Sequence, residues 1–151
     1  LYFDIKHQND TQTESLRSSA YIYNLLNRIG DKRCALCGCP IQEIVQGAHV
    51  WNVADIRHSN LQDSEKFKAA TNGNNGLWLC QNHHKLFDAN IIMIDHDGSL
   101  RISDTLDDYD TAFIKEMTPE RHLEKSILSD EFLQYLDLRN VSVDISHSVA
   151  I

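Results

Sequence analysis

Hydrophobic and polar positions divide the chain into helical ends and a middle of short elements. Apolar residues recur near helical spacing over residues 11–29, and Gly30 follows as a helix stop, so we expect a helix of about five turns there. Weak alternation over residues 1–9 predicts a short strand. The apolar positions that set the helical spacing are Leu16, Ala20, Ile22, Tyr23, Leu25, Leu26 and Ile29.

Short apolar runs separated by polar turns fill the middle of the chain. Asn and Gly crowd residues 72–76 and favour positive φ angles, so no regular element is expected there. The elements expected around this turn are a strand (43–51), a long connection (52–71) with a short helix (64–70), a second strand (77–79) and a helix (82–89).

The last third of the chain combines a hairpin with helices. Residues 91–95 and 99–103 flank His96-Asp97-Gly98, a turn sequence typical of a β-hairpin. An ill-defined tail is expected after two helical stretches, near 111–116 and 120–138, on either side of Pro119.

Length favours a single domain. A chain of 151 residues lies within the usual range of about 100–200 residues per domain. The expected α+β domain covers residues 1–151, with a core over about 31–103, an N-terminal helix over about 11–29 and a C-terminal helical region over about 111–140. Because the sequence does not begin with Met, we expect it to be a fragment of a longer protein.

Four potential metal ligands occur as two closely spaced pairs. Cys34 and Cys37 form a C-x2-C pair, and Cys80 and His83 form a C-x2-H pair, which together supply the four ligands of a tetrahedral structural zinc site. Such a zinc ion contributes on the order of 10–16 kcal/mol of apparent binding energy, so it would be part of folding. Cys39 is the remaining cysteine, and we expect it to pack or stay free.

A second centre is expected on the same helix. His84 lies one residue beyond His83, a rotation of roughly 100° on a helix, so it points away from the zinc site. Asp88 follows four residues later on the same side of the helix as His84. His84 and Asp88 can therefore converge on another metal ion or on a catalytic centre.

Net charge and the composition of segments limit how the chain could bind nucleic acid and where in the cell it is expected. A net charge of −8 argues against a protein whose whole surface binds nucleic acid, although a local basic cleft stays compatible with it. The sequence shows no signal peptide and no apolar run near 18 residues, which predicts a soluble cytoplasmic chain where clustered Cys and His bind metal. The acidic run 104–110 is expected to lie away from any nucleic-acid cleft. The basic residues expected to contact a nucleic-acid backbone are Arg57, Lys66, Lys68 and Lys85, with Arg33 nearby in sequence.

Three motifs resemble those of HNH endonucleases. They are Gly47-Ala48-His49-Val50 at a strand end, Asn74-Asn75-Gly76-Leu77 in a loop, and Cys80-x2-His83-His84-x2-Phe87-Asp88 on a helix. The resemblance is specific over residues 33–95. It implies a ββα-metal fold, also called a His-Me finger, with a Cys3His zinc site and flanking helices.

The resemblance also implies a chemistry for each motif. His49 would be the general base that activates water, since a neutral imidazole suits that task at cellular pH. Asn75 would orient the loop or His49, or act as a metal ligand, and His84 with Asp88 would hold one divalent cation: Mg²⁺, Mn²⁺, Ni²⁺ or Zn²⁺. The implied partner is DNA, and the implied setting is restriction or antiviral defence. Because one site cuts one strand, double-strand cleavage would require a homodimer or a second site, and a fused recognition or sensor domain could supply DNA contacts.

One departure from the family pattern leaves alternatives open. Many family members place a metal-ligating Asp or His immediately before the base, where this chain has Ala48. The chain could therefore be a zinc-stabilised binding module that has lost catalysis. An RNA nuclease is a third reading. The other histidines, expected at the surface, are His7, His58, His96, His122 and His147.

Overall fold

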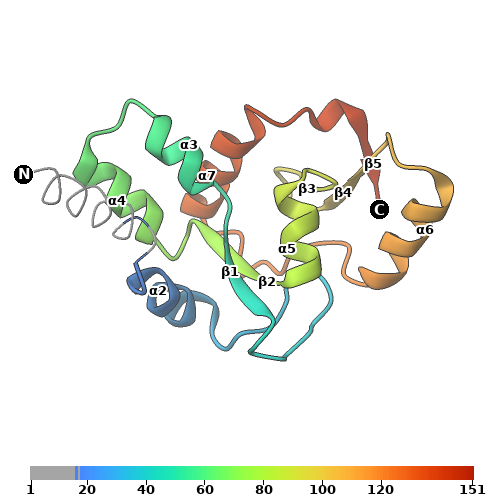
Figure 1. The fold of residues 1–151 in the computed structure, drawn as a ribbon, viewed down its shortest axis with the longest axis horizontal. Coiled ribbons are helices and arrows are strands. Elements are labelled where there is room, and N and C mark those ends of the chain that lie inside the picture. Colours follow the sequence, from blue (N-terminus) through green and yellow to red (C-terminus); the bar gives the residue numbers. More distant parts are fainter. Residues whose placement is uncertain (1–15, 17) are drawn as a thin grey trace, which may run out of the picture.

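A two-stranded antiparallel hairpin and one helix form the centre of the computed structural model, which describes residue 16 and residues 18–151. Strand β1 (Val45–His49) pairs with β2 (Gly76–Cys80), with His49 opposite Gly76. Helix α5 (Gln81–Asp88) follows β2 directly and contacts both strands (Figure 1). The predicted α+β fold with a ββα core is confirmed.

Burial explains why these residues form the hairpin. All five residues of β2 are buried, so its apolar run needs no alternation. Val45 and Ala48 are the buried residues of β1. On α5, His83 and Phe87 are buried and lie one helical turn apart.

The connection between β1 and β2 contains two helices where one was predicted. Helix α4 (Asp63–Thr71) corresponds to the expected helix at 64–70, but α3 (Val53–His58) was not expected. A helix of six residues is too short to give a periodic pattern. The Asn52 side chain caps it by accepting the Asp55 N–H at 2.8 Å.

The turn at 72–76 is irregular through Asn75, but the positive φ angles expected there are absent. Among the described residues, positive φ occurs at Gly30, Gly38, Asn90 and Gly98. Close approach explains Gly76 instead: an added Cβ would lie 1.7 Å from the Tyr21 hydroxyl. The prediction of positive φ angles at 72–76 was wrong, because a glycine can be required either by a tight turn or by close packing, and its presence in the sequence does not distinguish the two.

Helix α2 (Ala20–Ile29) is shorter than predicted, and its buried face is the predicted one extended by Tyr21. Ile22, Leu26 and Ile29 of the predicted stripe pack against the core. Ser18 and Ser19 are not helical, so the helix does not run continuously from residue 11. Tyr21 and Leu25 are buried, whereas Tyr23 is 67% exposed. The strand expected at 1–9 lies outside the described residues. Gly47 decides which face is buried, because Tyr21 and Leu25 pack where its side chain would be.

A second sheet covers the other side of α5. Its strand order is β3 (Ile92–Ile94), β4 (Leu100–Ser103) and β5 (Ser148–Ala150), all antiparallel. The hairpin predicted at 91–103 is confirmed, and its turn uses Gly98 at φ 89°.

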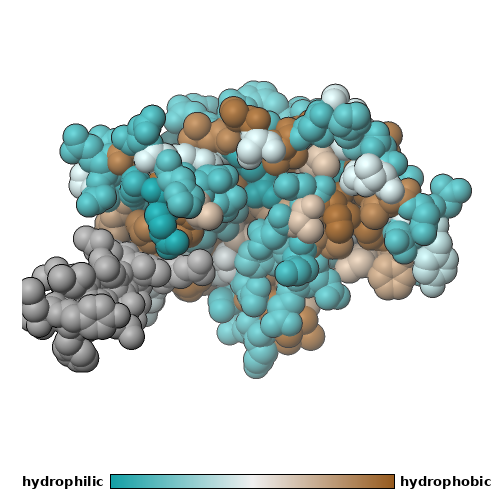
Figure 2. Space-filling model, turned by 45° about the horizontal axis from the view of Figure 1, so that its top comes forward, coloured by the Kyte–Doolittle hydropathy of each residue, from teal (hydrophilic) through white to brown (hydrophobic). Residues whose placement is uncertain are grey.

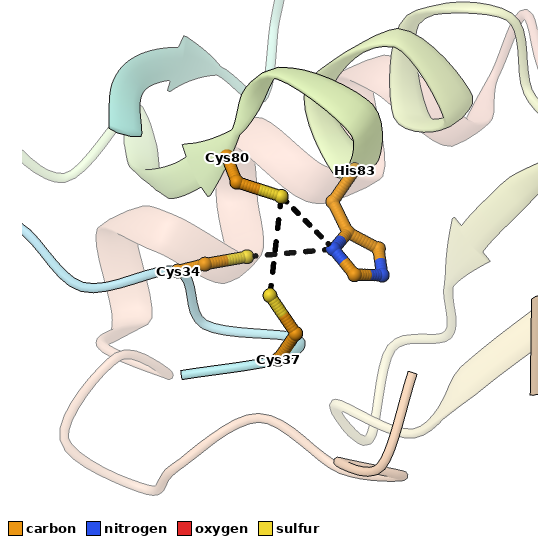
Figure 3. Close-up of side chains that lie close together, drawn as sticks. All are labelled: Cys34, Cys37, Cys80 and His83. Atoms are coloured by element: carbon orange, nitrogen blue, oxygen red, sulfur yellow. Dashed lines mark hydrogen bonds between the residues drawn. The ribbon is translucent and has the colours of Figure 1, made fainter. Parts of the chain in front are cut away.

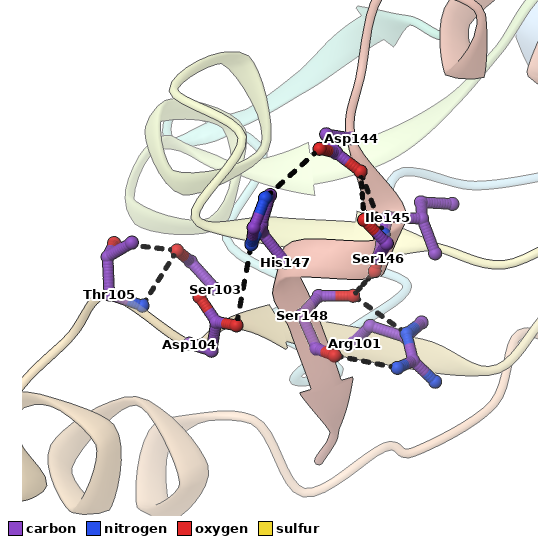
Figure 4. Close-up of polar contacts among 9 residues, drawn as sticks. All are labelled: Arg101, Ser103, Asp104, Thr105, Asp144, Ile145, Ser146, His147 and Ser148. Atoms are coloured by element: carbon purple, nitrogen blue, oxygen red, sulfur yellow. Dashed lines mark hydrogen bonds and ion pairs between the residues drawn. The ribbon is translucent and has the colours of Figure 1, made fainter.

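The tail expected to be ill-defined is ordered against β4. A 3-10 turn, η1 (Ile145–His147), leads into β5. Arg101 donates to the Ser148 hydroxyl at 2.7 Å and to its carbonyl at 2.8 Å (Figure 4). His147 lies between the carboxylates of Asp104 and Asp144. Short polar sequences gave no sign of this pairing, because the partner strand lies about 50 residues away.

Two helices flank the second sheet, and both boundaries differ from prediction. Helix α6 (Asp108–Met117) begins inside the acidic run, because Asp107 caps it and carboxylates suit a helix N-terminus. Helix α7 (Asp130–Asn140) begins ten residues later than the expected helix at 120–138. Residues 120–129 form an irregular segment with a turn at 125–127, although Leu123 and Ile127 are buried.

One hydrophobic core joins the hairpin, the second sheet and the helices. On the face shown in Figure 2, hydrophilic residues predominate and hydrophobic ones form separate groups. Within the described part of the chain, no helix is long and apolar enough to span a membrane.

Candidate metal centre and cleft

The four predicted zinc ligands converge on one point. Cys34 and Cys37 lie in the turn before β1, Cys80 ends β2, and His83 lies in the first turn of α5 (Figure 3). The ligand atoms all lie within 4.8 Å of one another. This is the one group of three or more Cys, His, Asp and Glu in the described residues that could hold a metal ion.

The spacing of the ligand atoms fits a tetrahedral zinc ion. The Cys37 and Cys80 sulfurs are 3.9 Å apart, and His83 Nδ1 lies 3.6 Å from the Cys34 sulfur and 3.3 Å from the Cys80 sulfur. Zinc bonds of usual length predict edges of about 3.8 Å between two sulfurs and about 3.6 Å between sulfur and nitrogen. The chain therefore has a preformed Cys3His metal site.

Thr118 orients the histidine of this site. His83 Nε2 lies 2.9 Å from the Thr118 hydroxyl, and both side chains are fully buried. Donation from Nε2 leaves Nδ1, which faces the sulfurs, as the nitrogen with a lone pair. The C-cap residue of α6 thus supplies a supporting contact to the Cys3His site.

The Cys37 thiol stays protonated at neutral pH unless a metal binds it. Burial raises the pKa of the Cys37 thiol to about 12, and the neighbouring Cys34 and Cys80 thiols raise it further. Metal binding would therefore release protons. Cys39 is not part of the cluster; its carbonyl accepts the Cys34 N–H at 2.9 Å.

A separate cleft of about 580 Å³ brings together the other predicted residues. His49, His84 and Asp88 all line it. Helix α2 forms one wall, the start of α3 another, and Arg139 of α7 lies among the lining residues. Asn75 is fully buried and does not line this cleft.

His49 is held on two sides at the end of β1. Its Nε2 lies 2.8 Å from the Ala70 carbonyl, near the C-terminus of α4. A carbonyl only accepts, so Nε2 carries the proton and Nδ1 is the basic nitrogen of the neutral ring. The Tyr21 ring stacks on His49 with centroids 3.9 Å apart and planes at 12°.

Tyr21 is itself fixed by the loop before β2. Its hydroxyl donates to the Asn75 carbonyl at 2.9 Å. Burial raises the pKa of Tyr21 far above its usual range, so the hydroxyl stays protonated.

The Asn75 side chain grips the chain just beyond His49. Its amide oxygen accepts the Trp51 N–H at 2.7 Å, and its amide nitrogen donates to the Trp51 and Ala69 carbonyls at 3.0 and 3.1 Å. Both polar atoms are therefore engaged away from the cleft. The arrangement favours the orienting role expected for Asn75 over the metal-ligand role.

His84 and Asp88 face each other across one turn of α5. His84 Nδ1 lies 2.8 Å from the Gln46 amide oxygen, and His84 Nε2 lies 3.4 Å from Asp88 Oδ2. Because the amide oxygen accepts, Nδ1 carries the proton of a neutral ring and Nε2 presents a lone pair. A lone pair facing a carboxylate oxygen attracts a cation, either a metal ion or a proton.

The residue before His49 supplies no further ligand. Ala48 is fully buried and has no donor atom. Near His49, the described cleft lining therefore offers His84 and Asp88 as side chains that could hold a cation.

The basic residues predicted to contact nucleic acid lie outside the cleft lining. Arg57, Lys68 and Lys85 are exposed, and the Lys66 ammonium donates to the Arg57 carbonyl at 2.6 Å. Among the described residues that line the cleft, Arg139 is the one Lys or Arg.

Sequence reasoning missed three residues around the cleft: Tyr21, Gln46 and Arg139. Tyr21 adjoins the predicted apolar stripe, so a one-position shift of the helix face would have found it. Gln46 and Arg139 carry no local signal, because an exposed strand Gln and a helix Arg are usually solvated.

Comparison with known families agrees with the sequence motifs. Residues 34–95 match the family model described as HNH endonuclease. No curated protein matches the chain significantly. The matched segment begins at the first zinc ligand, ends just after β3, and contains every ligand and cleft residue predicted from the motifs.

Proposed function

Because residues 34–95 carry the HNH endonuclease family match and form its ββα core, we propose that the chain is a metal-dependent endonuclease that hydrolyses DNA phosphodiester bonds. The observation that carries this proposal is the cleft itself. One cavity is lined by His49, the candidate base, and by His84 and Asp88, the candidate cation ligands, and this proximity supports the proposal.

His49 is the proposed general base. Its Nδ1 would take a proton from the attacking water while the water oxygen bonds to phosphorus and the bond to the leaving oxygen breaks. The Ala70 carbonyl holds Nε2–H, and the stacked Tyr21 ring fixes the plane of the imidazole. Asn75 would keep the adjoining backbone in place through its bonds to Trp51.

His84 and Asp88 are the proposed holders of one divalent cation, with Gln46 orienting His84. Mg²⁺, Mn²⁺, Ni²⁺ or Zn²⁺ at this pair would supply positive charge to the phosphate and the leaving oxygen. The Cys3His site would hold a structural zinc ion.

The wider setting follows from family resemblance. We propose DNA as the substrate and restriction or anti-phage defence in the cytoplasm as the biological role. The net charge is −8, and Arg139 is the one Lys or Arg side chain that lines the described cleft. A second copy or a fused domain would therefore supply much of the DNA-binding energy. The exposed Arg57, Lys68 and Lys85, with the half-buried Lys66, would add contacts to the DNA backbone at the margins of the cleft.

Plasmid cleavage tests the activity. Supercoiled plasmid would be incubated with zinc-loaded protein and each of Mg²⁺, Mn²⁺ and Ni²⁺, beside His49→Ala and the matched control His58→Ala, an exposed histidine on α3. Cleavage by the wild type and His58→Ala that is lost in a folded His49→Ala supports the proposal. Equal cleavage by all three proteins would point to a contaminant and refute the role of His49.

A non-catalytic binding module is the second candidate, favoured by Ala48, which removes a usual metal ligand. Titration of zinc-loaded protein with Mn²⁺ separates the two readings. A nuclease should bind a second ion that His84→Ala abolishes, whereas a binding module would hold the Cys3His ion alone. Competition between DNA and RNA substrates would distinguish an RNA nuclease.

A further inference from the structure

Arg139 is a buried cation that the family match does not include. It lies near the end of α7, more than 40 residues beyond the matched segment, and its exposed fraction is 6%. Burial lowers the pKa of its guanidinium to about 10, while Asp88 and Asp55 favour the charged form, so Arg139 stays protonated at neutral pH. A buried charge is costly unless its donors are bonded, so its contacts indicate what it does.

Those contacts join the two elements that carry the cleft chemistry. Arg139 Nη1 donates to the Val50 carbonyl at 3.0 Å, and Val50 directly follows His49. Arg139 Nη2 donates to the Phe87 carbonyl at 2.6 Å, and Phe87 directly precedes Asp88. One rigid guanidinium thus spans the strand end and the helix end.

Two further contacts fix the plane and tilt of the guanidinium. Its central carbon lies 3.6 Å from the centroid of the Phe87 ring. Nη2 also donates to Asn90 Oδ1 at 3.1 Å, just beyond the end of α5. A planar fork that stacks on one ring and donates from both terminal nitrogens keeps a fixed distance between the groups it bonds, which an ammonium on a flexible stem does not.

We propose that Arg139 is a positioning residue that sets the separation between His49 and the His84–Asp88 pair by bridging the Val50 and Phe87 carbonyls. This inference rests on the proposed nuclease function. It assigns α7 to the working site, so the functional unit extends beyond the residues that match the family model.

The test compares Arg139→Met and Arg139→Lys with the wild type in the full chain. Arg139→Met keeps the apolar stem, and Arg139→Lys keeps the charge without the fork. Leu136→Ala is the control, since Leu136 is fully buried on the same helix but does not line the cleft. Each protein would be assayed for zinc content, unfolding temperature, kcat and KM on plasmid, and Mn²⁺ affinity by calorimetry.

We expect both Arg139 variants to lower kcat about 100-fold, because misplacement of reacting groups by about 1 Å has that effect. KM should change by less than about threefold, and Mn²⁺ affinity should fall about tenfold, the lower range for lost supporting contacts. Leu136→Ala should lower the unfolding temperature but retain kcat below that temperature.

Two results would overturn the positioning role. Either Arg139→Lys restores wild-type kcat, which would assign the effect to charge, or Leu136→Ala reduces kcat as much as Arg139→Met at matched stability. If the wild type cleaves nothing, the nuclease proposal fails, and the Mn²⁺ titration still decides: equal affinity in wild type and Arg139→Met would reject the bridge as well.

Discussion

At the scale of single residues, three histidines are each oriented by a hydrogen bond at one ring nitrogen, which leaves the other nitrogen facing the site. His49 Nε2 meets the Ala70 carbonyl, His83 Nε2 meets the Thr118 hydroxyl, and His84 Nδ1 meets the Gln46 amide. In each ring the remaining nitrogen is the one with the lone pair. Two of these partners, Thr118 and Gln46, can be replaced without touching the histidine.

Replacing Thr118 should weaken the zinc site. Thr118→Val keeps the shape of the buried side chain and removes the acceptor for His83 Nε2, so zinc affinity should fall about 10- to 100-fold. Competition with a fluorescent chelator measures it. Thr105→Val, at an exposed position, is the control and should match the wild type. Unchanged affinity in Thr118→Val would mean that the hydrogen bond does not orient His83.

Replacing Gln46 should act on the other centre. Gln46→Leu removes the partner of His84 Nδ1, so Mn²⁺ affinity at the His84–Asp88 pair should fall about tenfold while zinc content is unchanged. Calorimetric titration of zinc-loaded protein checks this. Gln42→Leu, an exposed position just before β1, should behave as wild type, and a loss in both variants would contradict the assignment.

At the scale of elements, α2 packs on the hairpin because two of its strand positions lack a side chain. A Cβ at Gly47 would lie 2.7 Å from the Leu25 side chain, and one at Gly76 would lie 1.7 Å from the Tyr21 hydroxyl. Close packing there also brings the Tyr21 ring onto His49. The helix–hairpin contact and the orientation of the proposed base are thus one arrangement.

Gly76→Ala should therefore disturb both stability and the His49 stack. Overpacking typically costs about 1–3 kcal/mol, and movement of Tyr21 should lower cleavage as well. Tyr21→Phe removes the clashing oxygen, so the double variant should be less destabilised than the sum of the single variants predicts. The Ala48 carbonyl, 2.8 Å from the added Cβ, should keep the relief partial.

Denaturant unfolding of the two single variants and the double variant measures this coupling. If the changes in unfolding free energy were strictly additive, the side chain added at position 76 would not clash with the Tyr21 hydroxyl. The double variant His49→Ala with Gly76→Ala provides a further check. Because His49→Ala should already be inactive, Gly76→Ala should change only the stability in this background.

At the scale of the whole molecule, the metal site connects segments that are far apart in the sequence. The Cys3His cluster joins the turn before β1 to α5, and Thr118 links it to α6. These elements surround one hydrophobic core. The apparent energy of a structural zinc site, on the order of 10–16 kcal/mol, is comparable to the whole net stability of a domain, about 5–15 kcal/mol.

Zinc removal should consequently unfold the chain. Treatment with a strong chelator at neutral pH should abolish the cooperative thermal transition seen by circular dichroism, and added zinc should restore it. Cys34→Ser should reproduce the metal-free state, whereas Cys39→Ser, outside the cluster, should retain both zinc and the transition. A cooperative transition that survives chelation would show that the core folds without metal.

Local spacing determined the chemistry that could be predicted from sequence alone. The Cys34–Cys37 and Cys80–His83 pairs have the short spacing of zinc ligands, and His84 and Asp88 lie four residues apart on one helix, whose geometry puts them on the same side. The hairpin at 91–103 was also predicted, since its turn residues demand their conformation.

Tertiary structure decided which distant residues support that chemistry. Tyr21 contacts the Asn75 loop across 54 residues, and Arg139 reaches Val50 across 89. The start of α7 and the strand β5 likewise depend on partners elsewhere in the chain. Such contacts arise from packing, in which a side chain's partner is set by the whole core and not by its neighbours in sequence.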